Sequence, residues 1–187
     1  MSTGYKIDEK SGAYFLTFQV VGWVDLFTRK DYRDMVIESF KYCQKEKGLN
    51  IFAYVIMSNH IHLLAQSEKD DLSGFIRDFK SFTSKRFIEF INGGNESRSD
   101  WLKLVFEYHG KFKKKQTNQV WTHENHAGHI FSQKFIEQKV GYIHNNPVRS
   151  GIVVNPEDYL YSSARNYVGL DSVIDIIEID FRWKTYG

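Results

Sequence analysis

Two strand-like runs lie almost back to back in the middle of the chain, and their closeness restricts the possible folds. Residues 49–57 (LNIFAYVIM) and 60–66 (HIHLLAQ) are rich in the β-branched, aromatic and aliphatic side chains that favour strands. Only Ser58 and Asn59, two turn-forming residues, separate the runs. We interpret the segment as a β-hairpin or a bent, nearly continuous ribbon, and a hairpin implies an antiparallel sheet.

Amphipathic helices are expected on both sides of this hairpin. In residues 30–47, apolar side chains recur at helical spacing, charged residues fill the other face, and Gly48 ends the helix. Residues 72–91 have the same pattern, and Asp70 and Asp71 supply negative charge and caps at the start. The other expected elements are strands at 13–21 and 173–179, helices at 101–112 and 132–145 (the latter closed by Pro147), and a loop at 92–100.

The order of these elements predicts the fold class. Strand, helix, strand, strand, helix is typical of an α+β fold, a ferredoxin-like antiparallel sheet with helices packed on one face. A C-terminal helix that carries Tyr142 is added to this sheet. The 187 residues, 42% of them hydrophobic, suffice for one compact domain. Because no repeat or linker divides the chain, we expect a single domain over residues 1–187, with its core at about 13–168.

Charge and apolar content narrow the functional classes. The formal net charge is only +2, so any nucleic-acid site must come from a local patch. No apolar run approaches the roughly 18 residues of a membrane helix, and residues 1–12 lack the apolar core of a signal peptide. Cys43 is the single cysteine, which excludes an intrachain disulfide and suits a reducing compartment. We therefore expect a cytoplasmic protein without a membrane partner.

Two histidines begin the second run of the hairpin. His60 and His62 are separated by one apolar residue, Ile61. On a strand, alternate side chains point to the same face about 7 Å apart, so both imidazoles can converge on one ion while Ile61 enters the core. Two imidazoles leave open coordination positions for substrate oxygens on a divalent metal. The same pair also fits a hydrogen-bonded surface pair without metal.

A tyrosine lies on the expected helix near residue 140. Val140 and Ile143 belong to its apolar stripe, which predicts the buried face. Tyr142 lies off this stripe, in line with Gln138 and Asn146 at intervals of four residues. A tyrosine on such a polar stripe can present its hydroxyl to a ligand, although for an arbitrary tyrosine a half-buried packing role is the commoner one.

These two segments together resemble one family. AYVIMSNHIHLLAQ is similar to the HUH block (histidine, hydrophobic residue, histidine) of the single-tyrosine transposases, and KFIEQKVGYIHNNPVRSGIV is similar to their tyrosine-helix block. PEDYLYSSARNY and YFLTFQVVGWVDLF also resemble the REP-associated tyrosine transposase branch, which is related to the insertion-sequence transposases. The resemblance runs from about Tyr14 to about Tyr167. The two blocks in this order are far more specific than either block alone.

The resemblance implies a function and a site. His60 and His62 would be metal ligands for Mg²⁺ or Mn²⁺, and Tyr142 would be the nucleophile. Asn146 stands where the family often has a third, amide-bearing ligand, commonly glutamine, and its shorter side chain is a departure from that pattern. Such transposases cut and rejoin single-stranded or hairpin DNA through a covalent 5′-phosphotyrosine. For this branch we favour a monomer over a homodimer.

A basic cluster is the expected place for DNA to bind. Positive charge neutralises phosphates and aromatic rings stack on bases, which together suit single-stranded DNA, whereas a solvated loop is the alternative. The expected DNA-binding residues are Lys111, Lys113, Lys114, Lys115, Trp121 and Arg149.

A run of three histidines offers a second metal-like spacing. His123, His126 and His129 follow one another at intervals of three residues. No cysteine lies nearby and the resemblance assigns no metal there, so we interpret the run as a polar loop near the active site.

Three other functional classes remain open from the residues alone. A non-catalytic relative would bind single-stranded nucleic acid without forming a covalent adduct. A metal-dependent hydrolase of small phosphoesters or amides would use water as the nucleophile and would tolerate Tyr142→Phe. A scaffold protein without metal would need neither the imidazole pair nor the phenol.

Overall fold

The computed structural model describes residues 7, 9–111, 117–124, 126–130 and 132–180. Its centre is a four-stranded antiparallel sheet in the order β2-β3-β1-β4. The strands are β1 (Tyr14–Gln19), β2 (Leu49–Ile56), β3 (His60–Ser67) and the two-residue β4 (Gly128–His129). The α+β class and the antiparallel sheet are thereby confirmed, and the predicted hairpin is formed by β2 and β3.

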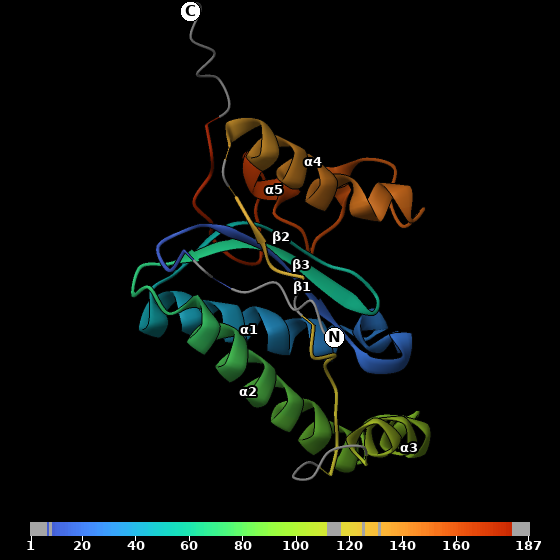
Figure 1. The fold of residues 1–187 in the computed structure, drawn as a ribbon. Helices are drawn as coiled ribbons and strands as arrows, with labels where there is room; N and C mark the ends of the chain where they lie inside the picture. The colour runs from blue at the N-terminus through green and yellow to red at the C-terminus, as the bar shows by residue number, and fades with distance from the viewer. Residues whose placement is uncertain (1–6, 8, 112–116, 125, 131, 181–187) are drawn as a thin grey trace, which may run out of the picture.

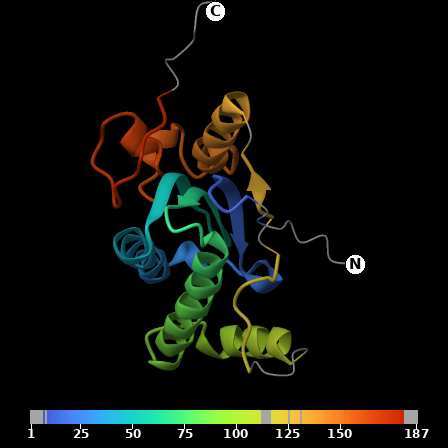
Figure 2. The same ribbon diagram turned by 60° about the vertical axis from the view of Figure 1, so that its left-hand side comes forward.

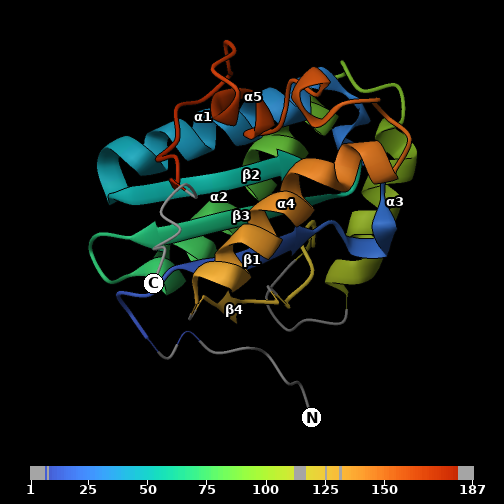
Figure 3. The same cartoon turned by 90° about the horizontal axis from the view of Figure 1, so that it is seen from above.

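Helices cover both faces of this sheet. Figure 1 shows α1 (Lys30–Lys47) and α2 (Leu72–Asn92) on one side, with α4 (Gln133–Arg149) and the short α5 (Ala164–Tyr167) on the other. Seen from above in Figure 3, α4 crosses over the strands. The helix α3 (Ser99–Gly110) lies beyond α2, on the side of the sheet away from α4 (Figure 2). Among the described residues, no helix is long and apolar enough to cross a membrane.

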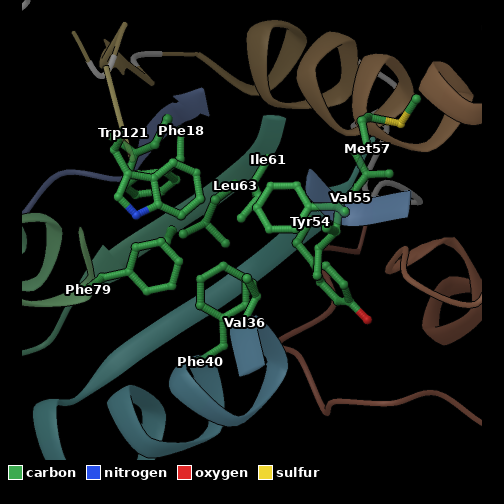
Figure 4. Packing of buried hydrophobic residues seen from close by; sticks show 14 of the residues in the cluster. Phe18, Val36, Phe40, Tyr54, Val55, Met57, Ile61, Leu63, Phe79 and Trp121 are labelled. Carbon is green, nitrogen blue, oxygen red and sulfur yellow. The ribbon is translucent and has the colours of Figure 1, made fainter. Parts of the chain in front are cut away.

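The core lies mainly between the sheet and the pair α1 and α2. Ile61 and Leu63 point into it from β3, and Phe40 and Phe79 meet them from the two helices (Figure 4). The Phe40 and Phe79 rings are stacked with their centroids 5.1 Å apart. Burial of such large apolar side chains is the main source of folding free energy, so this layer fixes the position of β3.

The predicted helix boundaries on this side are close to the observed ones. Gly48 ends α1 in the left-handed conformation (φ 64°), which glycine adopts without steric cost. Asp71 caps α2 by accepting a hydrogen bond from the amide of Gly74.

Two expectations about the chain path need correction. The tyrosine helix does not end at Pro147 but continues to Arg149, and Pro147 lies buried inside it. After Pro147 the helical hydrogen bonding resumes, since the amide of Ser150 donates to the carbonyl of Asn146. Residues 173–179 form no strand: Ile177 donates one hydrogen bond to Ile51, while Ser162 already bridges β2 nearby.

The loop at 92–100 is anchored by a buried carboxylate. Glu96 accepts hydrogen bonds from Tyr32 (2.9 Å) and Arg98 (3.2 Å), and Arg29 lies 3.2 Å away. Burial by itself would raise the pKa of Glu96, but these donors outweigh it and hold the pKa at about 2. The polar and glycine residues of this loop predict an irregular segment, but they do not indicate that Glu96 is buried.

Candidate active site

Strand β3 carries two histidines on the face opposite the core. In the β1–β3 register His62 pairs with Thr17 and His60 with Gln19. Because Ile61 between them enters the core, the alternation of the strand turns both imidazoles toward α4. The imidazole centroids are 4.7 Å apart. The pair therefore forms a compact cluster of nitrogen donors.

Helix α4 brings Tyr142 to this pair. Val140 and Ile143 are buried, whereas the Tyr142 side chain is 38% exposed. Its ring centroid lies 5.1 Å from that of His62 and 6.0 Å from that of Phe15. Two imidazoles and one phenol from segments some eighty residues apart thus share one site.

Each histidine has a hydrogen-bonding partner at Nδ1. His60 Nδ1 lies 2.7 Å from the side-chain oxygen of Asn59, which only accepts, so Nδ1 carries the hydrogen. His62 Nδ1 lies 3.0 Å from Thr17 Oγ1, a partner able to accept in the same way. With the hydrogen on Nδ1, Nε2 of each neutral ring keeps its lone pair. Metal-bound histidines are commonly oriented by such a bond at the other ring nitrogen.

Burial keeps both imidazoles neutral. Desolvation lowers the pKa of His60 below 6.5. It also lowers the pKa of His62 to about 3, with further contributions from the neighbouring His60 and Lys139. A neutral imidazole is the form that binds metal, so the pair is ready for a cation at physiological pH.

The donor set fits a divalent ion. His62 Nε2 is buried without a hydrogen-bond partner, and an unsatisfied buried nitrogen is costly unless a ligand binds it. Within the described ranges, no group of three or more histidine, cysteine or acidic side chains is suited to hold a metal. Amide or substrate oxygens could fill the remaining positions on such an ion. Asn146, half-buried one turn after Tyr142, carries such an amide.

Two cations flank the tyrosine. Lys139 Nζ lies 4.4 Å from the ring centroid of Phe15 and 5.8 Å from that of Tyr142. On the other side, the Arg149 guanidinium lies 5.6 Å from the Tyr142 ring. Arg149 was expected near DNA, whereas Lys139 and the Thr17 partner of His62 were missed. Lys139 was detectable, because it precedes Tyr142 by one helical turn; Thr17 depends on strand register, which the sequence does not display.

Of the other expected DNA-binding residues, the structure describes Lys111 and Trp121, and neither joins this cluster. Lys111 is exposed just after the end of α3, and Lys113, Lys114 and Lys115 lie outside the described residues. Trp121 requires a correction, because its side chain is only 4% exposed and packs against Phe18, Phe79 and Phe87. Its indole donates to Thr83, so Trp121 is a core residue and its ring is not available to a base.

The histidine run is distributed along the segment next to β1. His129 lies on β4, with its ring 5.1 Å from that of Tyr14, and His126 Nε2 lies 3.5 Å from Glu124. His123 and His126 both line a shallow pocket that also contains Gln19 and His109.

Comparisons with known proteins match part of the sequence and the overall fold. A family model described as "Transposase IS200 like" matches residues 23–98, the part that includes both histidines. A solved structure, described as a REP-associated tyrosine transposase bound to a REP hairpin, is similar with a TM-score of 0.63 and 20% sequence identity. The match covers 96% of this chain and 96% of that one. A search of curated proteins gives no match.

The resemblance indicated by the histidine block is therefore confirmed in sequence by the IS200-like transposase family model over residues 23–98, and the fold of nearly the whole chain is similar to that of a REP-associated tyrosine transposase.

Proposed function

We propose that this protein is a metal-dependent endonuclease and strand transferase that acts on single-stranded or hairpin DNA through a covalent 5′-phosphotyrosine. The observation that carries the proposal is the position of Tyr142, whose ring lies 5.1 Å from that of His62. A tyrosine, a neutral imidazole pair and two flanking cations together suit attack on a phosphodiester. A hydrolase that uses water would not need the phenol at this place.

The reaction is a pair of transesterifications. The hydroxyl oxygen of Tyr142 attacks the phosphorus, forms an O–P bond and displaces the 3′ oxygen, which leaves as a 3′-hydroxyl after taking up a proton. The phenol proton is lost to a base or to solvent, because an ordinary tyrosine is mostly protonated at neutral pH. A 3′-hydroxyl can later attack the phosphotyrosine, re-form the phosphodiester and return the phenol.

His60 and His62 would hold the metal, with Asn146 as a proposed third ligand. Mg²⁺ or Mn²⁺ at this place would offset charge that develops on the phosphate oxygens. The metal nitrogen donors would be the Nε2 atoms, since Nδ1 of each ring is already engaged. Lys139 and Arg149 would bind the phosphate itself, because both cations lie beside the Tyr142 ring.

DNA is the proposed partner, and the chain would act as a monomer. The similar solved structure holds a REP hairpin, and its fold covers nearly the whole of this chain. The histidines and Tyr142 of one chain already lie together, so no second copy is required to complete the site. Lys111 and the three lysines that follow it, Lys113, Lys114 and Lys115, would add sequence-independent attraction for the backbone.

A covalent-adduct assay tests the proposal. The protein would be incubated with Mn²⁺ and a labelled hairpin oligonucleotide with single-stranded flanks, and then separated on a denaturing gel. We expect a slowly migrating protein–DNA band that is lost in Tyr142→Phe and in the double variant His60→Ala, His62→Ala. Tyr42→Phe is the matched control, because Tyr42 is also exposed but lies on α1.

The outcomes separate the proposed reaction from its alternatives. An adduct that persists in Tyr142→Phe would show that another residue is the nucleophile. Cleavage without any adduct in the parent protein would favour the water-based hydrolase. DNA binding without cleavage, over a panel of hairpins with different flanks, would favour the non-catalytic relative.

A further inference from the structure

The loop after β1 contains an unusual bend. Gly22 and Trp23 are consecutive residues with positive φ, 63° and 56°. Glycine adopts this region freely, but a bulky aromatic residue there is a steric outlier. Backbone strain of this kind persists where the surrounding structure enforces it, and it is concentrated at functional sites.

The bend turns one aromatic side chain outward. Trp23 is 66% exposed, while its neighbours Val21, Val24 and Leu26 are buried. Glycine or asparagine would make the same bend at a lower steric cost, so neither the bend nor the core explains a tryptophan here.

The strained loop is bonded to the turn that carries His60. The amide of Val20 donates to the carbonyl of Asn59 (3.0 Å), and that of Phe27 donates to the carbonyl of Ser58 (2.8 Å). The Asn59 amide nitrogen donates to the carbonyl of Trp23 (3.4 Å), and its oxygen accepts from His60 Nδ1 (2.7 Å). One asparagine side chain therefore links the backbone of Trp23 to the imidazole of His60.

The other side of the loop is held by α3. A Cβ at Gly22 would lie 3.3 Å from His109 Nε2 and 3.6 Å from Val105, so the backbone approaches this helix closely. Further along, Arg98 donates to the carbonyl of Asp25 (3.1 Å). Because it is supported from both sides, the loop backbone has little conformational entropy left to lose on binding.

We propose that Trp23 is a stacking residue for an unpaired nucleobase of single-stranded DNA adjacent to the phosphate at His60. The inference rests on the proposed function and names a contact that positions its substrate. Every base has a π face, and aromatic side chains stack on bases with little sequence preference. Lys139 and Arg149 would hold the phosphate beside Tyr142. Trp23, attached to the turn before His60, would hold a base next to that phosphate.

A binding experiment without chemistry tests this assignment. In a Tyr142→Phe background, the dissociation constant for a fluorescein-labelled 12-nucleotide oligothymidine is measured by anisotropy. Trp23→Gly is expected to weaken binding roughly tenfold, in keeping with the loss of one base stack. The slope of log Kd against log salt should stay the same, because no phosphate contact is removed. Trp23→Phe should retain most of the affinity.

Two controls separate stacking from a structural effect. Trp23→Gly should keep or raise the Tm, because glycine relieves the positive φ. Tyr42→Ala, which removes another exposed aromatic ring on α1, should leave Kd unchanged. Unchanged affinity in Trp23→Gly, or no binding of oligothymidine by the parent protein, would overturn the inference. The covalent-adduct assay reports on Tyr142 separately, so failure of one proposal is distinguishable from failure of the other.

Discussion

The two faces of strand β3 contrast sharply although they alternate residue by residue. Toward α1 and α2, Ile61 and Leu63 lie in a fully apolar layer with Phe40 and Phe79. Toward α4, the same strand presents imidazoles whose pKa values are lowered by burial, and one buried nitrogen, His62 Nε2, has no hydrogen-bond partner. The apolar face buries only hydrocarbon side chains here, whereas the face toward α4 buries a polar nitrogen that lacks a hydrogen-bond partner.

This difference indicates how the fold can hold a reactive site. An unpaired buried nitrogen costs free energy, and it persists only if other interactions fix the strand in place. The apolar layer beneath β3 supplies that stability through Ile61 and Leu63, which are the sequence neighbours of His62. Substitutions on the face toward α4 should therefore lower activity, whereas substitutions on the apolar face should lower the free energy of unfolding.

The largest expected effect is on activity, from His62→Ala. Loss of one of two imidazole ligands should lower metal-dependent adduct formation by roughly a hundredfold or more, since a bound metal contributes several kcal/mol to charge stabilisation. The rise in Tm on addition of Mn²⁺, which reports binding to the folded state, should also disappear. Single-turnover gels and thermal melts with and without Mn²⁺ measure the two effects.

Ile61→Ala is the matched control on the opposite face. It should lower the free energy of unfolding by about 2–5 kcal/mol, because it leaves a cavity in the apolar layer, and should keep the Mn²⁺-induced rise in Tm. If both variants changed stability and metal response alike, the separation of the two faces would be refuted.

A smaller effect is expected from Thr17→Val, which removes the hydroxyl 3.0 Å from His62 Nδ1. Without this partner the imidazole is less well oriented, and metal affinity should fall by roughly 10- to 100-fold. Titration of Mn²⁺ against Tm or adduct yield measures the change. Thr17→Ser keeps the hydroxyl and should restore the affinity; equal loss in both variants would point to packing instead.

The smallest expected effect concerns pH and His144, which lies on α4 and is bonded to Ser163 (2.9 Å). Burial lowers the pKa of His144 from 6.5 to about 4. Below pH 6.5 the unfolded chain gains a proton at His144 that the folded chain does not. The free energy of unfolding therefore decreases as the pH is lowered, by at most about 1.4 kcal/mol per pH unit for one group.

His144→Gln should keep the hydrogen bond and make the decline of Tm between pH 6.5 and 4.5 shallower. The dependence that remains would come from His60 and His62, whose pKa values are lowered as well, and near pH 4.5 also from Glu96, whose pKa is held at about 2. An unchanged pH profile would indicate that His144 is already protonated in the folded protein.

Much of the sheet and its helices was predictable from local pattern. The hairpin around Ser58 and Asn59, the end of α1 at Gly48 and the exposed position of Tyr142 follow from turn chemistry and periodicity. Patterns failed where long-range contacts decided the outcome. Trp121, expected at a DNA surface, entered the core because its indole could donate to Thr83.

The side chains that share each face of β3 follow from local sequence alone, because successive residues of a strand point in opposite directions. Tertiary structure alone decided what meets them there: Thr17 through strand register, Tyr142 and Lys139 through the packing of α4, and Trp23 through the bonds of Asn59. Such partners come from segments far apart in the chain, and only the folded arrangement brings them within contact.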